Sequence, residues 1–160
     1  MKAIRIHTHG NTDVLKIDKI DLPICKDNEV KIKIKACSLN HLDIWVRNGL
    51  PGLPISLPLI LGSDGSGTII EIGKNIKKYS IGDDVVIQPG TFDKTSKSVM
   101  RGKENYSKSY GILGETQDGV QAEYVCMKSK NIHCKPDSTH PNNQMTYLLQ
   151  TLFLYLIYFA

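Results

Sequence analysis

The sequence predicts a mainly β fold with short helices, arranged as a partly open β-barrel. Three observations favour this fold: short segments that alternate apolar and polar residues, glycine-containing turns between them, and little helical periodicity in 160 residues. The alternation is clearest over residues 30–36, VKIKIKA, where apolar residues face one side and lysines the other. We expect these lysines to lie on the outer face of the barrel and to discourage pairing at a free sheet edge.

The other strands are predicted from shorter segments of the same kind: residues 2–7, 14–20, 68–72, 84–87, 120–125 and 131–134. One short helix is predicted to start at Asn40, a good N-cap residue, and to end at Gly49. Asp43 would lie near the positive end of that helix. Residues 51–58 contain three prolines and predict an extended surface loop.

Four glycines fall within residues 61–73, LGSDGSGTIIEIG. A dinucleotide-binding loop needs the spacing G-x-G-x-x-G after a strand and before a helix. Gly65 and Gly67 supply the first two glycines, but Ile70 occupies the third position and the residues around it favour a strand. The local sequence therefore predicts a tight glycine turn leading into a buried strand, and not a phosphate site.

Composition limits the classes of function. Hydrophobic residues make up 41% of the chain and charged residues 22%, which is typical of a globular domain. The net charge of +4 is small and the lysines are spread over strands and loops, so we expect no nucleic-acid partner. The apolar run near residue 160 is shorter than the roughly 20 residues that a membrane-spanning helix needs, so we expect no membrane span.

Four cysteines are present at positions 25, 37, 126 and 134, without a C-x-x-C pair. The first residues of the chain contain no apolar signal core, so we expect free thiols and a cytoplasmic location. His133 and Cys134 are adjacent, but one such pair supplies too few ligands for a metal site. Zinc binding through Cys37 or Cys134 in an unusual geometry is the least favoured alternative.

Four blocks of sequence, in this order, resemble one known domain: VKIKIKACSLNHLDIWVRNG, LPLILGSDGSGTIIEIG, YSIGDDVVIQPG and YGILGETQDGVQAEYV. They are similar to the N-terminal GroES-like domain of the medium-chain dehydrogenase/reductase family. That family contains the zinc alcohol dehydrogenases and the zinc-independent quinone oxidoreductases. The resemblance covers residues 1–138. Residues 139–160 form an apolar tail, which we interpret as a remnant of the helix between the two domains of the family.

The resemblance implies that this chain does not bind the catalytic zinc of the alcohol dehydrogenases. The family's first zinc ligand, a cysteine, falls at Asn40, and its histidine ligand falls at Ser63. A serine hydroxyl is a poor zinc ligand, because it would have to ionise or bind in its neutral form. The hydroxyl used for proton relay falls at Leu42.

The family's structural zinc lobe is predicted to lack its metal as well. The four cysteine positions of that lobe correspond to Asp93, Ser96, Val99 and Ser107. Without thiolate ligands the lobe should not hold zinc, so we expect residues 90–110, which carry no periodicity, to form a mobile loop.

The remaining residues resemble the zinc-independent branch, and this resemblance implies four catalytic residues. Asn40 and Asp43 belong to the Asn-x-x-Asp/Glu block, and Ser63 and Asp64 would lie across the active cleft. Asn40 would hydrogen-bond the nicotinamide ribose or a substrate carbonyl. Alternatively, Asn40 is only a helix cap and Asp64 only accepts hydrogen bonds from the N–H groups of a turn.

The same resemblance implies that Asn40, His41 and Trp45 contact the cofactor. Trp45 would form an aromatic wall, and His41 would contact a cofactor phosphate. From the residues alone, a tryptophan on a short helix is more often part of the core, and His41 is more simply an exposed helix residue.

The resemblance implies an NAD(P)H-dependent oxidoreductase that acts on a small-molecule carbonyl, alcohol or quinone. We expect the Rossmann cofactor domain to be missing from this chain, because no G-x-G-x-x-G is present, and the isolated chain to be inactive. Its partner would be a second chain with a Rossmann domain, or another copy of itself. The alternative function is a non-catalytic β-barrel that binds a partner through the apolar residues 141–160.

Overall fold

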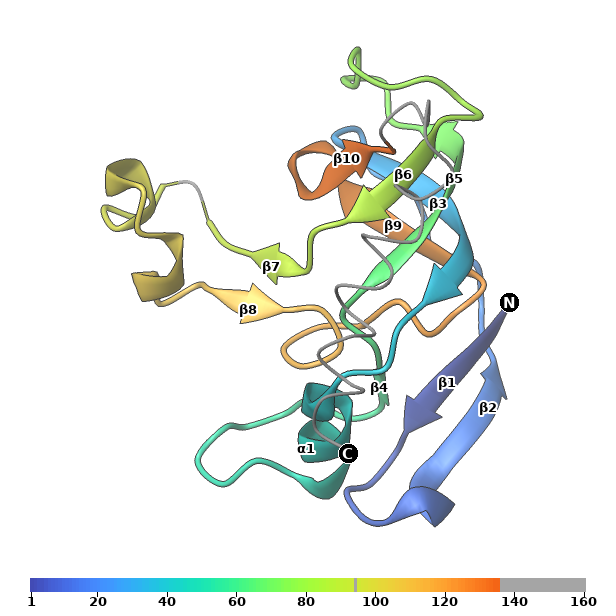
Figure 1. Ribbon diagram of the computed structural model, residues 1–160, viewed down its shortest axis with the longest axis vertical. Coiled ribbons are helices and arrows are strands. Elements are labelled where there is room, and N and C mark those ends of the chain that lie inside the picture. The colour runs from blue at the N-terminus through green and yellow to red at the C-terminus, as the bar shows by residue number, and fades with distance from the viewer. Residues whose placement is uncertain (94, 136–160) are drawn as a thin grey trace, which may run out of the picture.

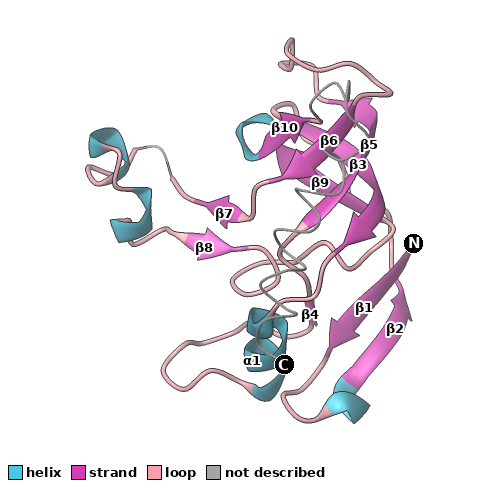
Figure 2. Cartoon of the chain, in the orientation of Figure 1, coloured by secondary structure: helices cyan, strands magenta, loops and turns pink. Residues whose placement is uncertain are grey.

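The computed structural model describes residues 1–93 and 95–135. This part of the chain forms ten short strands, one α-helix and four single-turn 3-10 helices (Figures 1 and 2). The predicted mainly β fold with short helices is therefore confirmed. No helix within the described ranges is both long enough and apolar enough to cross a membrane.

The larger sheet has five antiparallel strands in the order β10–β6–β5–β3–β9, and Figure 1 shows it curling into an open half-barrel. Its strands are β3 (Glu29–Cys37), β5 (Gly65–Ile72), β6 (Asp84–Ile87), β9 (Tyr124–Lys128) and β10 (Ile132–Cys134). Alternate residues of these strands point into one apolar core. Its fully buried members include Val30, Ile32, Ile69, Val85 and Ile132.

A smaller sheet, in the order β2–β1–β4, consists of β1 (Lys2–Ile6), β2 (Leu15–Lys19) and β4 (Leu59–Ile60). It packs with the only α-helix of the described residues, α1 (His41–Asn48), through a second apolar cluster of Ile6, Val46, Leu59 and Leu61. The prediction of a single helix that starts after Asn40 and ends at Gly49 is confirmed. Strand β4 was not predicted, because two residues are too few to show an alternating pattern.

A lobe extends away from the half-barrel, at the left of Figure 1. Its base is a two-stranded sheet of β7 (Gly90–Thr91) and β8 (Gly111–Ile112), and its tip carries 3-10 helices at Val99–Arg101 and Glu104–Tyr106. The sequence predicted a mobile loop without periodicity for residues 90–110, whereas the structure gives this segment short strands and 3-10 helices; its mobility stays a prediction. The lobe is held by local turns, which leave no periodic pattern in the sequence.

The lysines of β3 do not protect a sheet edge, so that expectation was wrong. Strand β3 lies between β5 and β9 and therefore has no free edge. Two of these lysines instead pair with acidic side chains of the same sheet: Lys31 with Glu71 on β5, and Lys35 with Asp84 on β6 at 2.8 Å. The prediction that apolar residues face the core and lysines face outwards is confirmed.

Asp84 gives a first prediction about stability and pH. Its Oδ1 accepts hydrogen bonds from Lys35 Nζ and from the Thr68 hydroxyl at 2.7 Å, and these contacts lower its pKa. A lowered pKa means that stability is present above the usual pKa of the carboxyl and is lost as pH falls through the lowered one. Because both charged side chains are substantially exposed, we expect Asp84→Asn to cost only about 0.5–1 kcal/mol at pH 7.

Urea unfolding at pH 7 and pH 3 would measure this effect. The difference in unfolding free energy between wild type and Asp84→Asn should shrink at pH 3. Asp27→Asn, which removes the exposed ion pair of Asp27 with Lys74, is a matched control with a smaller expected effect at pH 7. An unchanged difference at the two pH values would contradict the assignment to Asp84.

The glycines of residues 61–73 are arranged differently from the prediction. Gly62, with φ of +94°, lies before the strand, whereas Gly65 and Gly67 are already part of β5. Gly67 lies so close to β3 that a Cβ atom there would be 2.1 Å from the Lys33 carbonyl oxygen. The expectation that the segment is not a phosphate-binding loop agrees with this extended conformation.

The strand predicted at residues 120–125 begins later in the structure. Strand β9 starts at Tyr124, and the preceding residues instead bond to the loop after β4. The N–H groups of Val120 and Gln121 donate to the carbonyl oxygens of Gly62 and Leu61, at 3.0 and 2.9 Å. This long-range pairing connects the larger sheet to the smaller one, and sequence alternation cannot reveal it.

The tail of residues 139–160, including the apolar residues 141–160, lies outside the described residues. Its interpretation as an interdomain remnant and as a partner-binding segment stays a prediction. The same is true of the domain boundary at residue 138.

Candidate functional site

Asp43, in the first turn of α1, connects the start of the helix to the loop after β4. Its two carboxylate oxygens accept different backbone hydrogen bonds, from the Asn40 N–H at 2.7 Å and from the Gly62 N–H at 2.9 Å. Only 7% of its surface is exposed, and this burial raises the pKa of the carboxyl, although the two hydrogen bonds oppose the shift. Asp43 therefore holds together the two segments that carry the other predicted site residues.

Asn40 and Asp64 meet directly, although they are far apart in the sequence. The Asn40 side-chain Nδ2 donates to Asp64 Oδ2 at 2.9 Å, and the backbone N–H of Ser38 donates to the Asp64 carbonyl oxygen at 3.0 Å. The amide of Asn40 is thus oriented by a carboxylate. The sequence left open whether Asp64 serves only a turn, and the structure gives its carboxylate a side-chain partner on another element.

Ser63 is buried and its hydroxyl donates to the Leu113 carbonyl oxygen at 2.9 Å. That bond ties the loop after β4 to the end of β8. Ser63 is next to Asp64 in the chain, but its hydroxyl proton is already engaged. The structure therefore brings Asn40, Asp43 and Asp64 into one hydrogen-bonded group and gives Ser63 a separate partner.

His41 and Trp45 form an exposed pair on α1. Their ring centroids are 4.8 Å apart, with the planes tilted by 43°, as expected for residues one helical turn apart. Trp45 is 51% exposed, so the interpretation of this tryptophan as a core residue was wrong. A core position was favoured because tryptophan is apolar, but α1 buries the face that contains Asp43 and Val46. The cofactor contacts of His41 and Trp45 stay predictions.

Two buried polar side chains next to this group were missed by the sequence analysis. Ser38 Oγ and Gln121 Nε2 make no hydrogen bond to the part of the chain that the structure describes, although both residues are more than nine-tenths buried. Ser38 bonds through its backbone to Asp64, and Gln121 packs against Gly62. A buried donor without a partner is costly. The only sequence signal was a glutamine within the predicted strand VQAEYV.

The residues at the family's zinc positions do not fit a zinc ion. The Asn40 amide bonds to Asp64 and the Ser63 hydroxyl to Leu113, and neither group is a thiolate, imidazole or carboxylate. Residues 1–93 and 95–135 contain no cluster of three or more histidine, cysteine, aspartate or glutamate residues that could hold a metal.

The lobe that corresponds to the structural zinc site is connected by hydroxyl groups instead. The Asp93 N–H donates to Ser109 Oγ at 2.9 Å, and Ser109 Oγ lies 2.8 Å from Ser107 Oγ. Asp93 and Ser107 are two of the four residues that the family resemblance aligns with cysteines. Ser109 therefore connects these two residues through hydrogen bonds.

Residues 26–137 match the alcohol dehydrogenase GroES-like domain. The chain belongs to this family. The match spans most of the described residues and includes every strand from β3 to β10, so both the resemblance and the GroES-like fold are confirmed.

Relatives of this GroES-like domain include alcohol dehydrogenases and quinone oxidoreductases. The chain is 34% identical over 132 residues to an NAD-dependent alcohol dehydrogenase of Sulfurisphaera tokodaii. This alignment covers 78% of the chain and 38% of that protein. The chain is 35% identical over 86 residues to the quinone oxidoreductase of Sus scrofa, covering 53% of the chain and 26% of that protein.

A crystal structure of an NAD-dependent alcohol dehydrogenase superposes with a TM-score of 0.80 at 37% identity. The superposition covers 88% of this chain and 41% of that one. The chain thus spans well under half the length of the relatives that it matches.

Proposed function

We propose that this chain is the substrate-side domain of a zinc-independent, NAD(P)H-dependent oxidoreductase that acts on a carbonyl, alcohol or quinone. One observation carries the proposal: the Asn40 amide is oriented by Asp64 at a position where zinc-dependent relatives are expected to have a metal ligand. The printed activities of the relatives, an alcohol dehydrogenase and a quinone oxidoreductase, support the class of substrate.

Asn40 supplies the chemistry that the site needs on the substrate side. An asparagine amide has two N–H donors, and one of them is used by Asp64. The second can donate to a substrate oxygen, where negative charge develops when a carbonyl accepts a hydride. Asp64 fixes the direction of the amide and Asp43 fixes the backbone of Asn40, so the donor is positioned before substrate binds.

The nicotinamide cofactor, when bound, supplies the hydride. Trp45 and His41, exposed on the same helix as Asp43, are the residues of this chain proposed to contact it. The two glycines Gly65 and Gly67 lie in a strand, so this segment offers no cradle for the pyrophosphate. We therefore propose that the chain is inactive alone and needs a separate Rossmann domain, in a second protein or in a longer one.

A chimera tests the proposed function. Residues 1–138 would replace the corresponding domain of a zinc-independent quinone oxidoreductase, and NADPH-dependent reduction of an ortho-quinone would be measured with and without 1,10-phenanthroline. We expect activity that the chelator does not reduce, and a loss of about 100-fold in kcat for Asn40→Ala, as for removal of one oxyanion donor. Asn48→Ala, at the exposed end of the same helix, is the matched control and should leave kcat unchanged.

Inhibition by the chelator, or equal kcat values for Asn40→Ala and Asn48→Ala, would contradict the proposal. The isolated chain serves as a second control. Titration with NADPH should give no saturable micromolar change in Trp45 fluorescence, because this sequence contains no G-x-G-x-x-G loop to hold the pyrophosphate.

A further inference from the structure

The outer face of the larger sheet carries one row of three polar side chains across three strands. Cys126 of β9 lies opposite Lys31 of β3, and Lys31 lies opposite Glu71 of β5. Residues that are directly opposite in antiparallel strands share one face of the sheet. The neighbours Val30 and Met127 point into the core, so the row Cys126–Lys31–Glu71 faces outwards.

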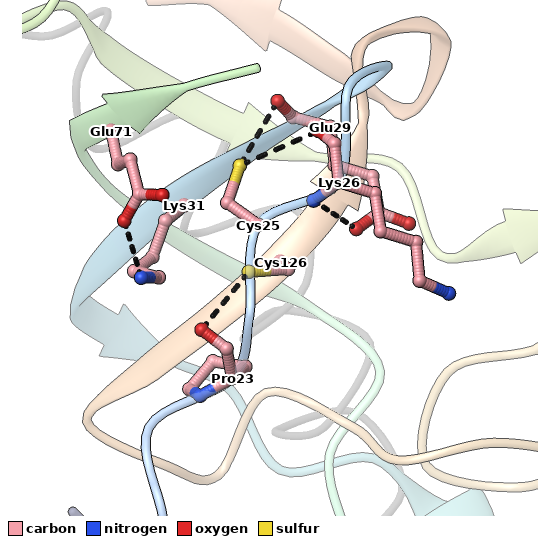
Figure 3. Close-up of polar contacts among 7 residues, drawn as sticks. All are labelled: Pro23, Cys25, Lys26, Glu29, Lys31, Glu71 and Cys126. Carbon is pink, nitrogen blue, oxygen red and sulfur yellow. Dashed lines mark hydrogen bonds and ion pairs between the residues drawn. The ribbon is translucent and has the colours of Figure 1, made fainter.

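The segment before β3 brings a second cysteine to this row, as Figure 3 shows. The Cys126 thiol contacts the Pro23 carbonyl oxygen at 3.7 Å, which places this segment over β9. Two residues later, the Cys25 thiol donates to the Glu29 carbonyl oxygen at 3.2 Å. Both cysteines are half-buried, and Cys25 lies only two residues along the chain from Pro23, whose carbonyl Cys126 contacts.

We propose that Cys25 and Cys126 are a modification site, a dithiol that low-molecular-weight disulfides oxidise reversibly to a disulfide bond. Nothing in the proposed oxidoreductase function uses this pair, because it lies on the outer face of the sheet and the Asn40–Asp64 group lies at the start of α1. The pair is also distinct from Cys37 and Cys134, which are exposed.

The reaction proceeds by two thiol–disulfide exchanges. The Cys25 thiolate attacks one sulfur of a small disulfide RSSR, which forms a mixed disulfide and releases one RS⁻. The Cys126 thiolate then attacks the Cys25 sulfur and releases the second RS⁻. The two protein thiols lose two electrons and two protons, and RSSR is reduced to two RSH.

The surroundings set the pH dependence of this reaction. Burial is the largest cause that raises the pKa of both thiols, and it raises that of Cys126 to about 12. Glu71 and Glu29 raise the pKa of Cys25 further, and the Lys31 ammonium group opposes them. Because only thiolates attack, oxidation should be slow near neutral pH and should accelerate as pH rises.

The bond would fasten the segment before β3 to β9, two parts of the chain that lie 101 residues apart (126 minus 25). A cross-link that closes so long a loop restricts the unfolded chain more than the folded one. The oxidised protein should therefore resist urea better than the reduced protein.

The test uses the full chain carrying Cys37→Ser and Cys134→Ser, so that only the proposed pair can react. The protein would be incubated with glutathione disulfide at pH 7.5 and pH 9.5, quenched with acid, alkylated and analysed by mass spectrometry. We expect an unalkylated product about 2 Da lighter than the reduced chain before alkylation, a proteolytic fragment linking Cys25 to Cys126, and formation at least about ten-fold faster at pH 9.5. The urea midpoint of this product should rise and should return after dithiothreitol.

Adding Cys126→Ser to the same background should instead give a stable glutathione adduct on Cys25. In the two-cysteine protein itself, a persistent adduct with Cys126 still open to alkylation would overturn the proposal. An oxidised product whose urea midpoint equals that of the reduced protein would overturn it too, because the cysteines would then not be joined in the native arrangement.

Discussion

Gly67→Ala is expected to destabilise the fold by about 3 kcal/mol, the largest effect among the single substitutions considered. The added methyl group would overpack against backbone atoms, and a side-chain rotation cannot relieve such a clash. The added Cβ would lie 2.1 Å from the Lys33 carbonyl oxygen and 2.8 Å from the Ile32 side chain. Strands β3 and β5 would have to separate at the centre of the larger sheet. Urea unfolding followed by Trp45 fluorescence measures the change.

Gly65→Ala is the matched control, two residues earlier in the same strand. Its Cβ would meet only Val120 side-chain atoms at 3.1 Å, and these can move by a few tenths of an ångström. We expect a cost of less than about 1 kcal/mol. If the two alanine variants were equally stable, the close approach of β5 to β3 at Gly67 would be disproved.

Asp43→Ala is expected to cost about 2–3 kcal/mol, because it leaves the Asn40 and Gly62 N–H groups without their acceptor. Asp43→Asn keeps one acceptor oxygen but turns an N–H₂ group towards the other donor, so it should cost about half as much. Unfolding in urea at pH 7 would rank the three proteins. Equal stability of wild type and Asp43→Ala would contradict the role of Asp43 in joining α1 to the loop after β4.

The same carboxyl predicts a pH dependence. Burial raises its pKa, so its contribution to stability is fully present below its usual pKa and decreases as pH rises through the raised one. The Asn variant cannot titrate at this position. The stability difference between wild type and Asp43→Asn should therefore be larger at pH 4 than at pH 7, and the opposite trend would show that the two hydrogen bonds outweigh burial.

Local chemistry explains which elements the sequence predicted well. Strand β3 was predicted because its alternation is continuous, and α1 because Asn40, Asp43 and Gly49 mark its two ends. Strand β9 was misplaced because Val120 and Gln121 pair with the loop after β4, a contact between segments about 60 residues apart in the chain.

The candidate site was also predicted only in part from the sequence. Asn40 and Asp64 were predicted from the family resemblance, and the structure adds the hydrogen bond that joins them. The engagement of the Ser63 hydroxyl with Leu113 and the burial of Ser38 depend on how distant segments pack. No pattern within the sequence around these residues reports such contacts, so only the structure could identify them.

The central claim is that hydrogen bonds take the place of zinc at two positions, between Asn40 and Asp64 and among Asp93, Ser107 and Ser109. The zinc content of the purified chain tests this claim most directly. Elemental analysis after dialysis against metal-free buffer should give well under one equivalent of zinc per chain, with unchanged urea stability after treatment with a chelator. One tightly bound zinc per chain, lost together with stability on chelation, would contradict the account.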